Sequence, residues 1–284
     1  MKKRMMVVAA GLMFASQAHA FEWSDDSISY WYGPYFRMPG STSPEHPNGN
    51  NVGMNNIEFT HTDGFKYGTN FFDALLLMSN RQDPANATGH QPQGAYEGWF
   101  VYRNDLSFNK IFNTDKFTFG PFSDIGFNSG FNWDAKNNYY ASGEFAFRFG
   151  PSFHIKVPVG FWQISAGAYK EMNNDGYYGP TNFHWTYNVE SSWNIPFTVG
   201  PVPLSLQGYL NVIGPKGNDY TQPTKTEVLL HPKIMVDVGQ LAFGKKNWIE
   251  AGVGWEYWYH KFGANNSVGG AIQSTPFVEA KLHF

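Results

Sequence analysis

The chain has 284 residues, no cysteine and a formal net charge of −3 at pH 7. These values exclude a disulfide framework, and the absence of a basic patch argues against a nucleic-acid partner. Its 30 Gly residues and 18% aromatic residues are typical of one large unit built from β-strands and turns.

Residues 1–20 have the layout of a secretory signal peptide. Residues 2–4 are Lys-Lys-Arg, residues 5–15 are mostly apolar, and residues 18–20 form the small-residue cleavage sequence Ala-His-Ala. The mature chain is therefore expected to begin at Phe21. It contains no apolar run of about 18 residues or more, so the sequence offers no candidate for a membrane-spanning helix.

Segments that alternate polar and apolar side chains follow along the rest of the chain, separated by clusters of Gly, Pro, Asn and Asp. A period of two is typical of strands that have water on one face and an apolar environment on the other. The segments expected to be strands are 24–36, 54–62, 65–79, 97–112, 116–133, 139–156, 161–171, 181–194, 203–213, 225–239, 247–261 and 273–284.

The expected connections alternate in length. Long polar ones fall at 37–53, 80–96, 172–180, 214–224 and 262–272, and short ones at 63–64, 113–115 and 157–160. Long outer loops and short periplasmic turns are typical of outer-membrane barrels. The prolines inside expected strands predict a bulge or a strand end wherever they occur, at Pro121, Pro151, Pro232 and Pro276.

Several segments separate their two faces clearly. In 203–213, Leu204 and Leu206 fall on one face, and Ser205 and Gln207 fall on the other. Segment 181–194 is expected to place one face toward lipid and the other in a lumen, with Phe183, Trp185, Tyr187 and Val189 opposite His184, Thr186, Asn188 and Glu190.

The last segment, 276–284, alternates in the same way and ends on an aromatic residue. Its outer face would carry Val278, Leu282 and Phe284, and its inner face would carry charged side chains such as Glu279. The terminal Phe284 resembles the closing strand of bacterial outer-membrane proteins, where the barrel assembly machinery recognises it. An apolar outer face and a charged inner face suit a membrane barrel.

These observations together predict an all-β fold. We expect a transmembrane antiparallel β-barrel of about twelve strands in an up-and-down meander, formed as one domain by residues 21–284 and located in the bacterial outer membrane. The alternative is a soluble β-sandwich, which leaves unexplained the N-terminal segment, Phe284 and the aromatic residues near the ends of expected strands, such as Trp248, Trp255, Tyr257 and Tyr259.

The inner wall of such a barrel would carry mixed charges that partly pair with each other. Because eight strands fill their own interior and about sixteen leave an open channel, twelve strands predict a narrow lumen. The charged residues expected on the wall are Glu58, Asp73, Arg103, Asp105, Asp134, Glu144, Arg148, Glu190, Glu227, Lys233, Asp237, Glu250, Glu256 and Glu279.

The sequence contains no motif for a metal, a cofactor or a catalytic nucleophile. The nine histidines are scattered, and neither a G-x-S-x-G elbow nor a glycine-rich phosphate loop occurs. We therefore expect no metal, no cofactor and no enzyme. An outer-membrane hydrolase whose site is spread over several strands stays open as an alternative to the two hypotheses given below, and it would use His184, His231 or His260.

The segment Phe108-Asn109-Lys110-Ile111-Phe112-Asn113-Thr114-Asp115-Lys116-Phe117-Thr118-Phe119-Gly120-Pro121-Phe122 resembles the Tsx family of nucleoside-specific outer-membrane channels, which includes the OmpK phage receptors. Shorter likenesses are Tyr32-Gly33-Pro34 and Phe71-Phe72-Asp73. With the signal peptide, the length and Phe284, the resemblance covers the mature chain. Trp31 departs from it, because the family commonly has a basic residue there.

The resemblance implies a monomeric twelve-stranded barrel for passive uptake of nucleosides and deoxynucleosides. In the family an aromatic residue before the first Gly-Pro lies on the pore wall, and Tyr32 has that place here. A nucleoside needs aromatic faces for its base and polar groups for its sugar. The expected binding residues are Tyr32, Tyr169, Tyr209 and Trp258 for stacking, and Glu58, Asp73, Arg103 and Glu190 for hydrogen bonds.

A second hypothesis is that the barrel acts mainly as an adhesin or as a receptor for phage or colicin. The long connections 37–53 and 80–96 are rich in Pro, Asn, Gly and His and would suit an external partner. Under either hypothesis the partners include outer-membrane lipid and the barrel assembly machinery, and they do not include nucleic acid.

Overall fold

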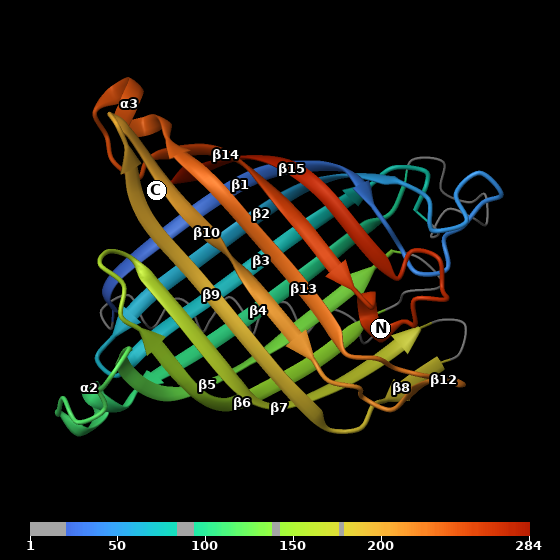
Figure 1. Ribbon diagram of the computed structural model, residues 1–284, viewed down its shortest axis with the longest axis horizontal. Coiled ribbons are helices and arrows are strands. Elements are labelled where there is room, and N and C mark those ends of the chain that lie inside the picture. The colour runs from blue at the N-terminus through green and yellow to red at the C-terminus, as the bar shows by residue number, and fades with distance from the viewer. Residues whose placement is uncertain (1–20, 84–93, 138–142, 176–178) are drawn as a thin grey trace, which may run out of the picture.

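The computed structural model describes residues 21–83, 94–137, 143–175 and 179–284, so the expected signal peptide lies outside the described residues. Long antiparallel strands dominate the chain (Figure 1). Twelve of them form the barrel: β1 (Phe21–Phe36), β2 (Val52–Phe65), β3 (Gly68–Ser79), β4 (Tyr96–Ser107), β5 (Phe122–Lys136), β6 (Glu144–Ile155), β7 (Phe161–Asp175), β9 (Thr186–Val199), β10 (Val202–Ile213), β13 (Glu227–Asp237), β14 (Ile249–Tyr259) and β15 (Ile272–His283).

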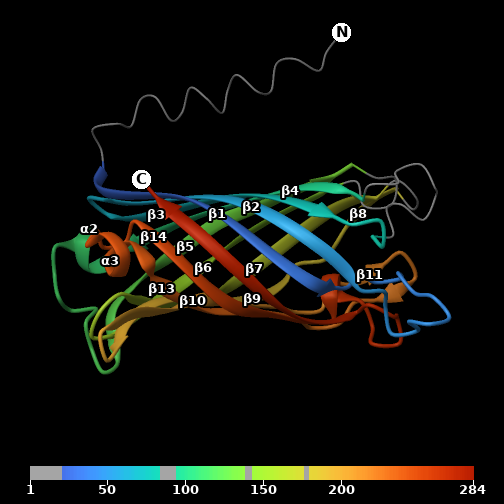
Figure 2. The same cartoon turned by 90° about the horizontal axis from the view of Figure 1, so that it is seen from above.

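The sheet closes on itself. Each strand pairs with the next one along the chain, and β1 pairs with β15 from Ser27 opposite His283 to Tyr32 opposite Val278. Seen from above, the strands cross at a steep angle on the near and far walls, as the tilt of a closed barrel requires (Figure 2). The structure therefore confirms the predicted all-β antiparallel barrel of about twelve strands in a meander.

Short elements decorate the two ends. β8 (Gly179–Asn182) pairs with the end of β7, and β11 (Asn218–Asp219) pairs with β12 (Gln222–Pro223). The described helical segments are α2 (Phe108–Phe112), α3 (Val238–Phe243) and the 3₁₀ turn η2 (Lys261–Gly263). None of the helices in the described ranges is long and apolar enough to cross a membrane.

The connections differ between the two ends of the barrel. We call one end the loop end; its connections are 37–51, 80–95, 137–143, 176–185, 214–226 and 260–271. We call the other end the turn end; its connections are 66–67, 108–121, 156–160, 200–201 and 238–248. Two of the turn-end connections are long and carry helices, which the sequence analysis did not expect.

The strand expected over 97–112 and the turn expected at 113–115 are therefore wrong in part. β4 ends at Ser107, whose side chain caps α2 by accepting a hydrogen bond from the Lys110 backbone N–H. Asn113 ends the helix in the left-handed region, at a φ of 48°. The apolar residues Phe108 and Phe112 are four positions apart, a spacing that places them on one face of a helical turn and also on one face of a strand, so the sequence did not distinguish the two.

The expected strand over 181–194 is also corrected at its start. β9 begins only at Thr186, because the end of β7 pairs with β8 instead. Phe183 lies outside β9 and is 3% exposed, so it does not face outward as expected. From Asn188 and Glu190 onward the inner face is as predicted, since both residues lie in the lumen.

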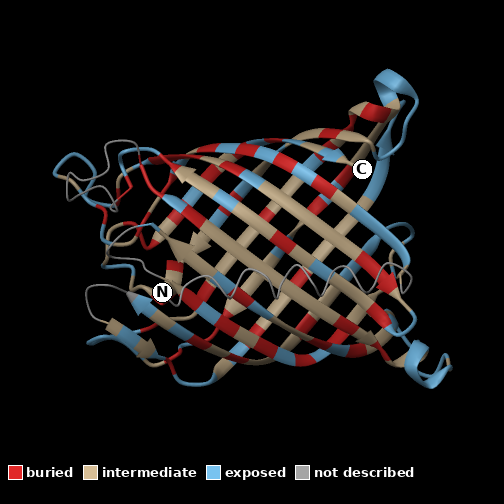
Figure 3. Cartoon of the chain, turned by 180° about the vertical axis from the view of Figure 1, so that it is seen from behind, coloured by how far each residue is buried: buried red, intermediate tan, exposed pale blue. Residues whose placement is uncertain are grey.

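The outer wall of the barrel carries large apolar side chains that are exposed. Trp133 is 46% exposed, Tyr187 50%, Val253 61% and Val278 55%. Figure 3 shows exposed and half-exposed residues along the outside of the strands. The inner face buries polar side chains instead, such as Asn56 at 0%. This is the reverse of a soluble β-sandwich and matches a barrel with an apolar surrounding.

Two strands approach each other closely where the chain has paired glycines. The ladder between β6 and β7 lacks pairs between Phe149 opposite Ala168 and Ser152 opposite Ser165, a gap that contains Pro151. A Cβ added to Gly150 would lie 2.2 Å from the Ala166 carbonyl oxygen. The absence of a side chain at Gly150 therefore allows the β6 and β7 backbones to approach each other closely at the point where Pro151 interrupts the hydrogen bonds.

At the other three prolines, the strand pairing agrees with the predicted bulge or strand end in two cases and not in the third. Pro232 also falls in a gap, between Leu230 opposite Tyr257 and Lys233 opposite Gly254. Pro121 directly precedes β5, as a strand end would. Pro276 pairs with Trp255 inside an unbroken ladder, so the expected irregularity is absent between β14 and β15.

We expect Gly150→Ala to lower the free energy of unfolding by roughly 1–3 kcal/mol, because its methyl group overlaps backbone atoms that have no room to move. Urea titration of the refolded protein in detergent measures the change. Gly98→Ala is the control, since a Cβ there meets only the Phe100 ring at 3.4 Å. Equal effects of the two substitutions would contradict the close approach.

Candidate functional site in the barrel lumen

The lumen is lined by charged and polar side chains from every barrel strand. The fourteen charged residues predicted for the inner wall all lie on inner-face positions in the observed register. Most of them are buried or half-buried by each other. The lumen is therefore crossed by ion pairs rather than being a clear tube.

Glu190 forms the centre of one ion cluster. Its Oε1 lies 3.0 Å from Arg103 Nε, and its Oε2 lies 2.9 Å from Arg103 Nη2. Arg148 Nη1 approaches Oε1 to 2.7 Å. Arg103 is on β4 and Glu190 on β9, and β5, β6 and β7 separate these strands. The cluster therefore joins three strands that are not neighbours in the wall, β4, β6 and β9, through charge-assisted contacts.

A second cluster combines two carboxylates with a lysine. Glu58 on β2 accepts a hydrogen bond from Ser29 at 3.1 Å, and Asp73 on β3 lies beside Glu58. Lys233 is close enough for its charge to act on both carboxylates, and its Nζ lies 2.6 Å from Glu279 Oε2. This part of the wall therefore offers acceptors for a hydroxyl or amino group.

An aromatic stack is formed by side chains from β10, β13, β15 and β1. The Tyr209 and His231 rings are parallel within 5°, with centroids 5.1 Å apart. His231 stacks on Phe277 at 4.4 Å, and the Trp31 edge approaches His231 at 5.5 Å. His231 Nδ1 is bound to Glu256 at 2.9 Å, which fixes the ring plane.

Tyr209 differs from the rest of this stack in being accessible. It points into the lumen, yet 39% of it is exposed, whereas Trp31 is 4% exposed and Phe277 2%. One face of its ring packs on His231, so the exposed part is open to the lumen. A flat solute therefore meets a fixed aromatic surface at this position.

Three buried lysines close the loop end. Lys136 lies 2.9 Å from Asp83, Lys216 pairs with Glu171, and Lys261 donates to Gln273 at 2.7 Å. Lys261 also stands 4.5 Å above the Trp258 ring. Three of the loop-end connections, those that contain Asp83, Lys216 and Lys261, are therefore held at the mouth of the barrel by polar and charged contacts.

The pKa values of Lys216 and Lys261, two buried lysines in the loop-end connections, are shifted in opposite directions. Burial lowers the pKa of Lys261 to about 8, and the nearby Glu256 charge offsets this only in part. Burial also acts on the pKa of Lys216, but the charges of Glu171, Glu227 and Glu144 outweigh it and raise the pKa above the usual value. The neighbouring carboxylates thus stabilise the charged form of Lys216, whereas burial destabilises the charged form of Lys261.

Five of the predicted binding residues meet in the middle of the lumen. They are Glu58, Asp73, Arg103, Glu190 and Tyr209, and the charges of Glu58, Asp73 and Glu190 all reach Tyr209. The structure thus brings the hydrogen-bonding residues and one stacking residue into one region. Whether a solute binds there stays a prediction.

Tyr32 is placed on the outer face, so its expected pore role is wrong. It pairs with Asn55 and Val278, is 38% exposed, and shares its face with Ile28 and Tyr30. Trp31, one residue earlier, fills the lumen instead. A strand changes face at every residue, so an error of one position moves a side chain from lumen to exterior.

Tyr169 and Trp258 lie on the inner face but are already occupied. Tyr169 is 3% exposed, and its hydroxyl donates to Glu171 at 3.1 Å. Trp258 donates to Glu227 at 2.7 Å, and Lys261 and Phe262 cover its ring. Neither offers a free face to a solute in this arrangement.

The sequence analysis missed the roles of Trp31 and Phe277. A signal was present, because Ser27 and Ser29 share the parity of Trp31 and are polar, as inner residues should be. The candidate histidines for an enzyme site lie in different surroundings: His184 is exposed, His231 is in the stack, and His260 Nδ1 contacts the Thr226 carbonyl at 2.8 Å.

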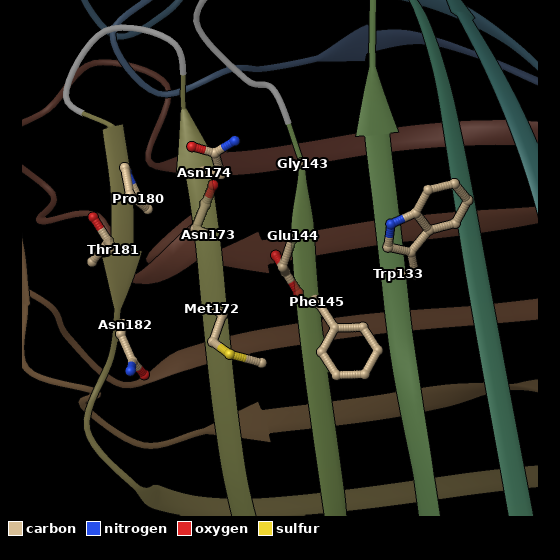
Figure 4. A pocket seen from close by; sticks show the side chains of 10 residues that line it. All are labelled: Trp133, Gly143, Glu144, Phe145, Met172, Asn173, Asn174, Pro180, Thr181 and Asn182. Carbon is tan, nitrogen blue, oxygen red and sulfur yellow. The ribbon is translucent and has the colours of Figure 1, made fainter. Parts of the chain in front are cut away.

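A depression of about 490 Å³ lies at the rim of the loop end, outside the central region (Figure 4). Side chains of both faces border it, including the inward Glu144 and the outward Phe145 and Trp133. Because it opens across the wall at the edge of the barrel, it does not belong to the lumen site.

No family model matches the chain, and no curated protein sequence matches it. Among solved structures, the chain is similar to the translocator domain of the autotransporter NalP from Neisseria meningitidis, at 10% identity over 98% of this chain and 92% of that chain, with a TM-score of 0.42. It is also similar to the β domain of the Bordetella autotransporter Brka, at 7% identity over 91% and 98%, with a TM-score of 0.40. Pseudomonas putida OprB follows at 8% identity over 97% of each chain, with a TM-score of 0.31. The fold assignment rests on the strand pairing of this chain itself.

We expect Glu190→Gln to lower the free energy of unfolding by about 2–4 kcal/mol, because two guanidinium groups lose their shared counter-charge in a half-buried place. Urea titration in detergent at pH 7 measures the change. Glu22→Gln is the control, since Glu22 and Lys110 form an exposed pair at 3.4 Å and should contribute below about 1 kcal/mol. A small effect at both positions would show that the central cluster does not hold the walls together.

Because of the lowered pKa of Lys261, we expect the free energy of unfolding of the protein to increase as the pH is raised above about 8. Its pKa is about 8 in the folded protein and near 10.5 without burial, so between these values the unfolded chain binds more protons. The free energy of unfolding should therefore increase over this window, by up to about 3 kcal/mol.

Urea titrations of wild type and Lys261→Met at pH 7, 8, 9 and 10 test this expectation. The variant should lack the rise, because methionine has no proton to release. Lys216→Met is the control: its pKa is raised, so the variant should lose stability evenly over this range and keep the rise. Parallel curves for wild type and Lys261→Met would contradict the assignment.

Proposed function

We propose that this protein is an outer-membrane channel for the passive diffusion of nucleosides and deoxynucleosides. The observation that carries the proposal is the Tyr209 ring, which stacks on His231, is partly exposed on the inner wall, and lies within range of the charges of Glu58, Asp73 and Glu190. A nucleoside combines a flat base with sugar hydroxyls, and this region presents a matching aromatic face and polar groups.

The membrane location is supported by the outer wall. Exposed Trp, Tyr, Val and Phe side chains suit hydrocarbon and its interfaces, and a closed sheet leaves no unpaired edge. Under this proposal the loop end faces the outside and the turn end faces the periplasm. Export by residues 1–20 and recognition of Phe284 by the assembly machinery belong to the same proposal.

The path of a solute is narrow in this arrangement. Trp31, Phe36, Met38, Val52 and Met54 pack together on the β1 and β2 side of the loop-end half. Under this proposal a solute passes beside the exposed Tyr209 ring and the Arg103–Glu190 pair. Passage at the mouth requires the loops that Lys216 and Lys261 hold to give way, which suits a selective channel rather than a general pore.

The energetics favour transit over trapping. One aromatic contact with a base contributes roughly 1–3 kcal/mol, and each neutral hydrogen bond about 0.5–1.5 kcal/mol. One accessible aromatic and a few polar groups therefore give weak binding, and conduction requires binding that is weak enough to release. The carboxylates and guanidinium groups remain paired with each other when no solute is present.

We expect Tyr209→Ala to reduce the entry of nucleosides into proteoliposomes by roughly tenfold, because the stacking face is lost. Swelling assays compare adenosine, thymidine and uridine with sugars and amino acids of similar size. Tyr209→Phe should keep most of the flux, since the ring remains. Tyr32→Ala is the matched control, because its side chain lies on the outer face.

Equal entry of all solutes through the wild type would contradict nucleoside selectivity and leave a general pore. The absence of entry through a correctly folded barrel would contradict transport altogether. In that case an external partner at the loop end would be the better assignment.

A further inference from the structure

Two rigid projections at the turn end are not used by the lumen site. We define the α2 foot as residues 108–121 and the α3 foot as residues 238–248. Figure 1 shows them at opposite edges of the same end, each standing outside the barrel wall. The α2 foot contains most of segment 108–122, which carries the family resemblance. The lumen site does not use this segment, so its function is a separate question.

The α2 foot is held rigid by its own contacts. The Phe108 and Phe117 rings have centroids 5.4 Å apart, and the Phe112 and Phe117 rings 5.9 Å apart. Asn109 accepts from the Phe117 backbone N–H at 3.0 Å and donates to Thr118 at 2.9 Å. The residues of the motif therefore build a fixed projection rather than a flexible turn.

The α3 foot is built in a comparable way. Asp237 caps the helix by accepting from the Gln240 N–H at 2.8 Å, and it also accepts from the Asn247 N–H at 2.9 Å. Gly244 ends the helix with a φ of 68°. The Phe243 and Trp248 rings meet at 5.5 Å, so the returning chain is packed against the helix.

Both feet expose large apolar side chains. In the α2 foot, Phe112 is 62% exposed and Phe119 51%. In the α3 foot, Leu241 is 51% exposed and Phe243 60%. Figure 3 draws both regions mostly in the exposed colour. Two capped, rigid elements that present aromatic rings outward need an apolar partner.

The charges of the feet differ from those of the whole chain. The α3 foot contains Lys245 and Lys246 and no acidic residue, and the α2 foot contains Lys110, Lys116 and one acidic residue, Asp115. The complete chain has a net charge of −3. Aromatic residues next to lysines are typical of segments that lie in the interface of an anionic lipid surface.

The placement of the feet around the barrel decides between partners. Six barrel strands separate the α2 foot from the α3 foot in either direction around the barrel. They are therefore diametrically opposite at one end. A lipid leaflet surrounds a barrel and meets both positions at once, whereas a protein would have to span the full width of the end.

We infer that the two feet bind the surface of the periplasmic lipid leaflet. The apolar side chains of each foot enter the boundary between headgroups and acyl chains, and its lysines contact the phosphates. Lysines close to an anionic lipid surface are attracted to it. This inference rests on the proposed membrane location, and it is independent of which solute passes through the lumen.

Nitroxide labelling tests the inference directly, because the chain has no native cysteine. Phe112→Cys and Leu241→Cys place labels on the feet, and Asp115→Cys is the matched control at an exposed charged residue of the α2 foot. Val253→Cys, at 61% exposure on the outer face of β14, reports the membrane location. Each labelled protein is reconstituted in phosphatidylcholine vesicles with one part in four of phosphatidylglycerol.

Collision of each label with oxygen and with a water-soluble nickel chelate gives its depth. We expect labels at 112 and 241 to favour oxygen over the chelate by at least about threefold compared with the label at 115. Lys245→Gln with Lys246→Gln should make the label at 241 shallower in anionic vesicles and leave it unchanged in phosphatidylcholine alone.

Two results would overturn the inference while Val253 still reports lipid. Labels at 112 and 241 that meet the chelate as freely as the label at 115 would show feet in water, and labels shielded from both reagents would show a protein partner. A Val253 label in water would instead overturn the membrane location, and with it the proposed function.

Discussion

The pairing of β1 with β15 is the constraint on which the rest of the structure depends. It turns a meander into a closed surface, so every strand has an inside and an outside and no backbone edge is left unpaired. Once closed, the period of two decides the environment of each side chain. Trp31 and Tyr32 show how sharp this division is, because neighbours in sequence lie in the lumen and on the exterior.

Closure also forces charge into a confined space, and the lumen compensates it across strands that are not neighbours. Glu190 serves Arg103 and Arg148 together, and Glu279 serves Lys233. Pairing of this kind fills the middle of the barrel while leaving the Tyr209 ring accessible. The contacts between these strands therefore also limit the width of the lumen beside Tyr209.

The fold could be predicted from the sequence because alternation is a local property that each strand repeats. Inner residues such as Arg103 and Glu190 follow from parity alone, whereas their meeting depends on the tilt and register of the whole barrel. Tyr32 was misplaced because the family resemblance, rather than the parity of its strand, assigned it to the pore. The helices at 108–112 and 238–243 were missed because so short a run of apolar residues suits one helical turn and a strand equally well.

The opposite placement of the α2 and α3 feet has a mechanical consequence for the barrel as a body. Two supports on one diameter resist rocking about the perpendicular direction, because such rocking lifts one foot and sinks the other. Rotation about the line that joins them meets no such resistance from either. Under the inferred contact of both feet with the lipid leaflet, the barrel therefore has one stiff and one soft tilt axis in the membrane plane. A barrel with short turns at every position would tilt equally easily in all directions.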